Sequence, residues 1–349
     1  MINTIQKGIN IKNIQFKSNI RNDSYVGIYL VNTFAVFKSI NDILYCIYSN
    51  KINSIIFYNL IDNKVINSIK NAHDNNITNF RHYYDKKNKY DLIISLSFMD
   101  NNLKIWNINN FELLLNLKDI NKQGFLRSAC VLNDGNQNLI ITSNDNNNLG
   151  NDYIKIFDFK GYQIKELSYV NKDIYYIDNY YDKKLCKYYI ITGNQGCCQA
   201  IDYNMDKIYH EYNTDTYYSD YGYTNFERAF YFELIILEDG EILKLIGSCN
   251  LDTIFIWNFN TTELLSRIEV CQNHELYGLC LWNDNYLFVA CGDKTIKLID
   301  VKNEVIIKEL TGHKNEILTL KKFFHPEYGE CLISQGAFSD SLKLWTFKN

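Results

Sequence analysis

The stretch Leu103-Lys104-Ile105-Trp106-Asn107 alternates apolar and polar side chains and closes on a bulky residue followed by Asn. Two equally clear copies close on Trp257, which is followed by Asn258, and on Trp345, which is followed by Thr346. Weaker copies close on four other bulky residues, namely Tyr58, Phe157, Ile201 and Ile299. Alternation of this kind is typical of a half-buried β-strand. Because the motif recurs at similar intervals, it predicts a repeat architecture.

The bulky positions 58, 106, 157, 201, 257, 299 and 345 lie 42 to 56 residues apart. A unit of roughly 40 to 45 residues with four short strands is typical of a propeller blade. Seven such units occupy nearly all of the 349 residues. We therefore expect residues 1–349 to form one all-β domain, a seven-bladed β-propeller of four-stranded antiparallel blades.

Apolar runs bounded by Asn and Asp place the strands within each unit. In the second unit they are expected at residues 77–83, 91–98, 103–108 and 112–117. The last unit offers only three, and the apolar alternation of residues 9–16 is expected to supply its fourth. That pairing would close the ring and cover an open sheet edge, which is otherwise prone to aggregation.

The seventh unit carries the most specific signal, with Gly312-His313, Ser334, Asp340 and Trp345 at regular positions. In these residues the sequence resembles the WD-repeat β-propeller family. The resemblance implies that the His, Ser, Asp and Trp form a buried hydrogen-bonded set that fixes one turn to the blade. Other units carry parts of the set, namely His73, Asp100 and Trp106 in the second, Trp257 in the fifth, and His274 and Asp293 in the sixth.

Composition favours a packed soluble protein, since 46% of the residues are apolar and 15% aromatic. The formal net charge of −4 gives no whole-molecule attraction to nucleic acid or membrane. The sequence shows no secretory signal and no apolar run of roughly 18 residues, so membrane insertion is not expected. Its ten cysteines lie mostly within apolar runs without a disulfide framework. We expect a cytoplasmic protein, with a nuclear location left open.

Searches for catalytic and cofactor motifs give no match. The sequence lacks the G-x-S-x-G, G-x-x-x-x-G-K-[ST], H-E-x-x-H and G-x-G-x-x-G patterns. Cys271 and His274 have a ligand-like spacing, but a structural zinc site takes four ligands and no second pair lies nearby. We therefore expect no catalytic residue, no metal and no cofactor.

An aromatic and acidic insertion between the fourth and fifth units is the leading candidate for binding partners. It contains four tyrosines, Tyr217, Tyr218, Tyr221 and Tyr223. Exposed tyrosines give large contact area at low entropic cost, so they are expected to contact partner proteins unless they pack onto the propeller. The leading hypothesis from the family resemblance is a non-enzymatic scaffold that docks proteins or peptides on the propeller faces. The resemblance identifies no subfamily.

Two similar loops carry a different possibility. They run from Tyr83 to Tyr90 and from Tyr180 to Tyr188, and their central lysines are Lys86, Lys87, Lys183 and Lys184. Lysines interleaved with aromatic rings are suited to nucleic acid or a phosphorylated ligand, although a solvated hairpin has the same composition. A second alternative is an enzyme whose active site lies in the central opening of the ring, where ionisable groups would gather.

Overall fold

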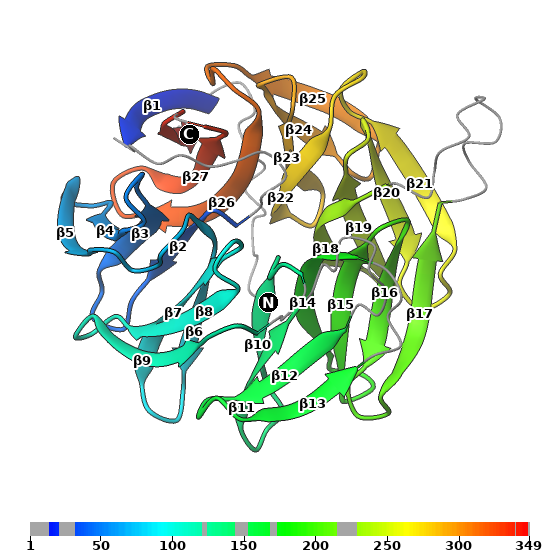
Figure 1. Cartoon of the computed structure of the whole chain (residues 1–349). Helices are drawn as coiled ribbons and strands as arrows, with labels where there is room; N and C mark the ends of the chain where they lie inside the picture. The colour runs from blue at the N-terminus through cyan, green and yellow to red at the C-terminus, as the bar shows by residue number, and fades with distance from the viewer. Residues whose placement is uncertain are drawn as a thin grey trace, which may run out of the picture.

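A computed structural model describes residues 14–20, 32–120, 124–143, 153–167, 173–214, 229–338 and 340–347. Over these residues the chain forms seven four-stranded antiparallel sheets arranged in a ring (Figure 1). The predicted seven-bladed propeller is confirmed. In six blades the strands follow one another from the axis outward, so consecutive strands are neighbours in the sheet.

We number the blades along the chain. Blade 1 holds β2 (Phe34–Lys38), β3 (Leu44–Ser49), β4 (Ile55–Asn59) and β5 (Lys64–Ile69), and blade 2 holds β6 (Ile77–Asp85), β7 (Tyr90–Ser97), β8 (Asn102–Asn107) and β9 (Glu112–Leu117). Blade 3 holds β10 (Ala129–Asn133), β11 (Asn138–Thr142), β12 (Ile154–Asp158) and β13 (Gln163–Leu167). Blade 4 holds β14 (Ile174–Asp182), β15 (Lys187–Asn194), β16 (Cys197–Asp202) and β17 (Lys207–Asn213).

The remaining blades complete the ring. Blade 5 holds β18 (Tyr231–Asp239), β19 (Ile242–Cys249), β20 (Thr253–Asn258) and β21 (Leu264–Glu269), and blade 6 holds β22 (Leu276–Asn283), β23 (Tyr286–Cys291), β24 (Ile296–Asp300) and β25 (Val305–Leu310). Blade 7 holds β26 (Ile317–His325), β27 (Gly329–Gly336), β28 (Leu342–Phe347) and, from the start of the chain, β1 (Ile14–Ile20).

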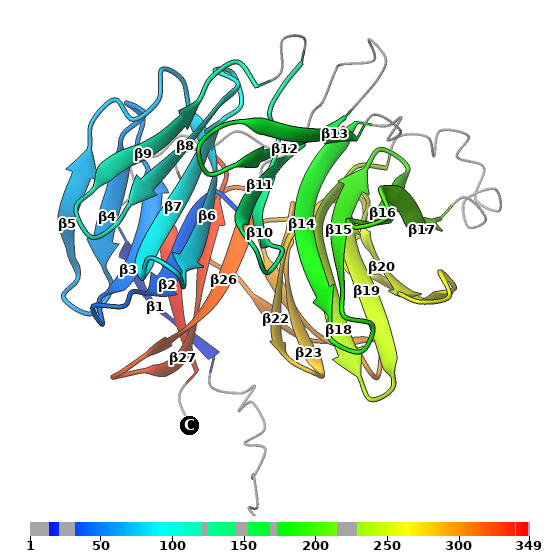
Figure 2. The same ribbon diagram turned by 90° about the horizontal axis from the view of Figure 1, so that it is seen from below.

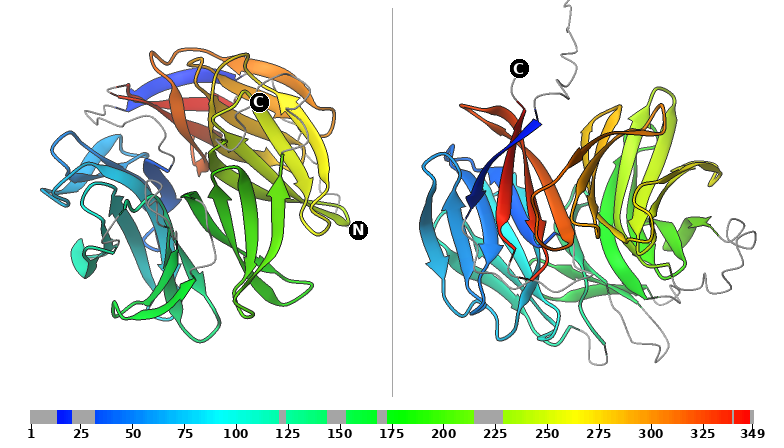
Figure 3. Two further views of the ribbon diagram at one scale, coloured as in Figure 1. Left: turned by 45° about the vertical axis from the view of Figure 1, so that its right-hand side comes forward. Right: turned by 90° about the horizontal axis from the view of Figure 1, so that it is seen from above.

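Strand β1 closes the ring by pairing antiparallel with β28, as blue and red strands side by side in Figure 3 show. This confirms the predicted closure, but the strand lies further along the chain than residues 9–16. It shares residues 14–16 with that range and continues to Ile20, while residues 9–13 lie outside the described part. Ile14 and Ile20 are the buried side chains of β1, and their burial fixes its position.

The recurring motif has a specific structural role. In blade 2 the side-chain oxygen of Asn107 accepts a hydrogen bond from the backbone N–H of Asn109 at 2.9 Å, which forms the turn between the third and fourth strands. The corresponding residue of five other blades makes the same type of bond, namely Asn59, Asp158, Asp202, Asn258 and Asp300. The Asp or Asn after the bulky residue therefore begins the hairpin that leads to the outermost strand.

The outermost strands are bulged next to this turn. Ile105 pairs with Leu115 and Trp106 with Leu113, so Leu114, which is 50% exposed, has no partner residue on β8. The same one-residue shift recurs in the five other blades whose four strands are consecutive in the chain. A bulge twists an edge strand and makes it a poorer template for pairing with another chain. The bulges therefore protect the outermost strands, which expose aliphatic side chains, from pairing with another chain.

The core consists of apolar layers between neighbouring blades. Between blades 1 and 2, for example, Phe57 of β4 packs with Phe80 of β6 and Trp106 of β8. At the axis the inner strands approach closely, since a Cβ on Gly278 of β22 would lie 2.7 Å from the carbonyl oxygen of Leu318. Within the described ranges there is no helix of the length and apolar character needed to cross a membrane.

Candidate functional site

Blade 7 assembles the residues that the family resemblance implied. Trp345 Nε1 donates to Ser334 Oγ at 2.8 Å, and the hydroxyl lies 2.6 Å from His313 Nε2. The Asp340 carboxylate can only accept, so Nδ1–H of His313 donates to its Oδ2 at 2.9 Å, and Nε2 of the neutral ring then accepts from the Ser334 hydroxyl. Burial alone would raise the pKa of Asp340, but the bonds from His313 and from Lys314 N outweigh it and lower the pKa to about 2.

Blade 2 has the same set in a looser form. Its His73 Nε2 lies 2.8 Å from Ser95 Oγ, and Trp106 Nε1 donates to that oxygen at 2.9 Å. The contact from His73 Nδ1 to Asp100 Oδ2 is longer, at 3.8 Å. Burial lowers the pKa of His73 to about 4, and the neighbouring Lys104 adds to the shift. In both blades the histidine is neutral and internally bonded, so it has a structural role.

The structure does not bring His274 and Asp293 of blade 6 together. His274 is exposed, and the Asp293 carboxylate binds Lys297 Nζ at 2.9 Å. Lys297 also donates to the carbonyl of Val270. In blade 2 the equivalent Lys104 donates to the carbonyl of Ala72, which directly precedes His73. By this equivalence the histidine position of blade 6 is taken by Cys271, the residue after Val270, and not by His274.

Cys271, Cys291 and Asp293 place their potential ligand atoms within 4.8 Å of one another. Their three ligands fall one short of a structural zinc site, and Lys297 already neutralises the carboxylate of Asp293. Burial raises the pKa of the Cys291 thiol well above its usual value. The cluster is therefore a packed thiol pair beside an ion pair.

In blade 5, Trp257 lies among aromatic rings instead of a His–Ser pair. It is fully buried, lies 6.1 Å from the Tyr212 ring and 5.9 Å from that of Tyr231, and donates its indole N–H to Asn213 O at 3.3 Å. Tyr212 in turn donates to Phe259 O at 2.7 Å. This aromatic cluster holds the start of the connection between blades 4 and 5.

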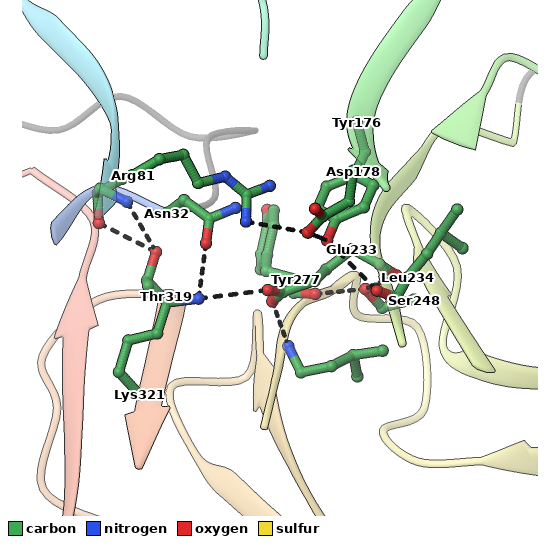
Figure 4. Close-up of polar contacts among 12 residues, drawn as sticks. Asn32, Arg81, Tyr176, Asp178, Glu233, Leu234, Ser248, Tyr277, Thr319 and Lys321 are labelled. Carbon is green, nitrogen blue, oxygen red and sulfur yellow. Dashed lines mark hydrogen bonds and ion pairs between the residues drawn. The ribbon is translucent and has the colours of Figure 1, made fainter. Parts of the chain in front are cut away.

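Ionisable groups do gather in the central opening, on the innermost strands (Figure 4). Arg81 of β6 donates to Asp178 Oδ2 and to Ile177 O of β14, each at 3.2 Å. The Tyr176 hydroxyl lies 3.0 Å from the same carboxylate. Burial opposes the charge of Arg81, but Asp178 and Tyr176 outweigh it and raise its pKa. Because β6 and β14 belong to blades 2 and 4, the pair bridges two blades that are not neighbours.

A second pair crosses the other side of the opening. Lys321 of β26 lies 3.5 Å from Glu233 Oε1 of β18 and donates to Asn32 Oδ1 at 2.6 Å. The other carboxylate oxygen, Glu233 Oε2, accepts from the backbone N–H of Leu279 in β22 at 2.6 Å. Blades 5, 6 and 7 are thus joined through one carboxylate. Arg81 with Asp178 and Lys321 with Glu233 thus form two cation–carboxylate pairs across the opening, and each pair is charge-balanced.

Sequence reasoning did not single out Arg81, Asp178, Glu233 or Lys321. One signal was present, because charged residues rarely point inward from the interior of a first strand. Each of three charged residues is the fifth residue of a first strand, namely Arg81, Asp178 and Lys321. Which cation meets which anion depends on the curvature of the ring and is not encoded in any local pattern.

The two basic loops lie on one face of the ring, the lower face in Figure 2. All first strands run in the same direction, so their hairpins to the second strands emerge together. Lys86 and Lys87 line a cavity of about 860 Å³ between blades 2 and 3, whereas Lys183 and Lys184 line a separate one of about 210 Å³ beside Glu238 and Glu241. The predicted tyrosine contacts Tyr217, Tyr218, Tyr221 and Tyr223 lie outside the described residues.

Comparisons with known proteins agree with this architecture. A family model described as "WD domain, G-beta repeat" matches residues 265–300, which run from β21 to the end of β24. The chain is also similar to the U3 small nucleolar RNA-associated protein 21 homolog of Schizosaccharomyces pombe, with 27% identity over 105 residues. That match covers 29% of this chain and 11% of the yeast protein.

Proposed function

This chain is a WD-repeat β-propeller, and we propose that it is a non-enzymatic scaffold that docks partner proteins within a small nucleolar ribonucleoprotein assembly. The observation that carries the proposal is the propeller itself, with residues 265–300 matching the WD repeat. A rigid ring presents loops from seven blades on two faces, which suits simultaneous contact with several partners.

The central opening supports a non-enzymatic role. Its cations and carboxylates are paired, with Arg81 on Asp178 and Lys321 near Glu233. A general acid or base needs a group that can exchange protons with a substrate. Here the carboxylates of the opening accept hydrogen bonds from the protein, so they stabilise the ring and bridge its blades.

The ribonucleoprotein context rests on the similarity to a protein whose name associates it with U3 small nucleolar RNA. On this proposal the protein acts in the nucleolus, in place of the cytoplasmic location expected from the sequence. Expression of a fluorescently tagged full chain in its source cells tests the location. Signal confined to the cytoplasm would count against the nucleolar assignment and leave the scaffold role standing.

Affinity purification of the tagged chain tests the scaffold role. We expect a reproducible set of partner proteins together with a small nucleolar RNA, with the proteins retained after partial RNase treatment. Recovery of the chain alone would overturn the proposal. An enzyme would be indicated instead if a partner-free preparation turned over a substrate and lost that activity on Glu233→Gln substitution.

The tyrosine insertion is our proposed partner contact. Replacing Tyr217, Tyr218, Tyr221 and Tyr223 together with Ser is expected to remove at least one partner protein from the purification. Tyr162→Ser is the matched control, because Tyr162 is 70% exposed on blade 3. An unchanged partner set in the quadruple variant would exclude the insertion as a docking site.

A further inference from the structure

The larger cavity on the lower face is a groove between blades 2 and 3, which we call the blade 2–3 groove. It has a volume of about 860 Å³. Its lining consists of residues 83–88 at the β6–β7 hairpin, Val131, Asn133 and residues 135–138 at the β10–β11 hairpin, residues 158–160 at the β12–β13 turn, Asn179 and Tyr188. Two blade-to-blade contacts shape its wall, since Tyr83 donates to Asn138 Oδ1 at 2.6 Å and Asn179 donates to Val131 O at 2.9 Å. The groove is therefore built by side chains from three blades.

Three lysines of the groove are free of ion pairs. Lys86, Lys87 and Lys160 are exposed, and within the described residues their ammonium groups pair with no carboxylate. Two lysines of blade 1 on the same face are paired instead, Lys38 with Asp42 at 2.7 Å and Lys64 with Asp62 at 3.3 Å. The groove thus concentrates positive charge that the protein itself does not use.

The acidic residues of the groove do not cancel that charge by pairing with the lysines. Asp85 accepts hydrogen bonds from the backbone N–H groups of Lys87 and Asn88, at 3.0 and 3.2 Å. Asp158 likewise accepts from the N–H groups of Lys160 and Tyr162, both at 2.9 Å. Both carboxylates hold their own turns, so the groups left for a ligand are the ammonium groups.

Aromatic rings and amide side chains accompany the lysines. Tyr84, Phe159 and Tyr188 are half-buried and line the groove. Asn88, Asn136 and Gln137 are exposed at its rim and offer both donors and acceptors. Basic groups that follow a phosphate backbone, combined with aromatic rings on which bases stack, are the features of single-stranded nucleic acid sites.

We propose that the blade 2–3 groove binds single-stranded RNA, with Lys86, Lys87 and Lys160 at phosphates and the aromatic rings beneath bases. An acidic peptide would satisfy the lysines but would leave the rings and the amide rim without a matching role. The smaller cavity at Lys183 and Lys184 is less suited to a polyanion, because Glu238 and Glu241 line it as well. RNA contact in this groove adds to the proposed scaffold role and does not require it.

The test is fluorescence anisotropy with the full chain and a labelled ten-nucleotide oligouridine at low salt. The variant carrying Lys86→Gln, Lys87→Gln and Lys160→Gln is expected to bind at least tenfold more weakly. Its logarithmic salt slope should flatten by about 2, since each phosphate contact on a single strand contributes about 0.7. The control replaces Lys38, Lys51 and Lys64 with Gln, which changes the net charge equally, and it should bind within twofold of the unchanged protein.

A labelled decaglutamate peptide separates RNA from an acidic partner. Tyr84→Leu is expected to weaken RNA binding severalfold, because leucine offers no ring for stacking. Equal affinity for peptide and RNA, or no effect of Tyr84→Leu on RNA, would overturn the assignment to RNA. So would RNA binding weaker than about 100 µM, the weak limit of non-specific association. Thermal melting of each variant verifies folding, and partner recovery after RNase treatment reports on the scaffold role separately.

Discussion

Blade 7 and blade 5 secure the connection that leads into their first strand by different chemistry. In blade 7 a tryptophan, a serine and a histidine form a chain of hydrogen bonds that ends on Asp340. In blade 5 a tryptophan packs against the rings of Tyr212 and Tyr231, and its indole N–H donates to Asn213 O. Both tryptophans are buried near the end of the third strand.

This difference shows that the position of the bulky residue matters more than its partners. The end of the third strand faces a neighbouring blade, so a large side chain there fills the layer between the two sheets. Polar partners are required only where the turn brings a polar group into that layer, because a buried polar group must be hydrogen-bonded. Aromatic packing stabilises the same place through buried area alone.

Blade 7 also differs in taking its fourth strand from the start of the chain, and this gives the largest predicted effect. Deleting residues 1–20 removes β1, with the buried Ile14 and Ile20. Burying each such side chain contributes about 1.5–3 kcal/mol, and the strand hydrogen bonds add to this. We expect a loss of about 5 kcal/mol or more by denaturant unfolding. Deleting residues 1–13 retains β1 and is the control; equal stability of the two truncations would contradict the closure.

In blade 5, Trp257→Ala is expected to cost about 3–5 kcal/mol, because it empties a fully buried site. The free energy of unfolding from urea titration measures this. The exposed Tyr162→Ala should change it by less than about 0.5 kcal/mol. A cost below about 1 kcal/mol for Trp257→Ala would mean that the neighbouring rings collapse into the space and that the aromatic cluster is not specifically packed.

In blade 7, His313→Ala is expected to cost about 2–3 kcal/mol, since it leaves Ser334 and Asp340 buried without their partner. His274→Ala in blade 6 is the matched control and should be nearly neutral, because that imidazole is exposed. Thermal unfolding of both variants decides the point. A larger effect at His274 would restore it as the structural histidine of blade 6.

The hydrogen-bonded blades should be more sensitive to acid than blade 5. Burial lowers the pKa of His73 to about 4 and also lowers that of His313. Below the unfolded pKa of about 6.5 the unfolded chain takes up protons that the folded chain refuses, so stability falls with pH down to the folded pKa. Between pH 6.5 and 5 the His73 contribution amounts to about 2 kcal/mol. In a variant carrying both His73→Asn and His313→Asn, the free energy of unfolding should depend less steeply on pH. An unchanged pH profile would mean that other groups cause the loss of stability in acid.

Much of the propeller was predictable because each blade repeats one local pattern. The alternation that closes on Trp106 places a third strand, and Asn107 after it places the next turn. The blade 7 set could be anticipated from His313, Ser334, Asp340 and Trp345, because these residues contact one another within a single unit. Blade 6 shows where this reasoning stops: a difference of three residues in the loop moves the histidine position to Cys271.

The sequence by itself determined the number of blades, the strand order and the closure of the ring, because strand alternation and turn residues act over short distances along the chain. Only the tertiary structure decided the contacts between blades that are far apart in sequence. Two ion pairs cross the opening: Arg81 and Asp178 are 97 positions apart in the sequence, and Glu233 and Lys321 are 88 positions apart. The blade 2–3 groove likewise depends on how three separate hairpins meet. Such contacts follow from the curvature of the closed ring, which fixes the distances between side chains that no local pattern relates.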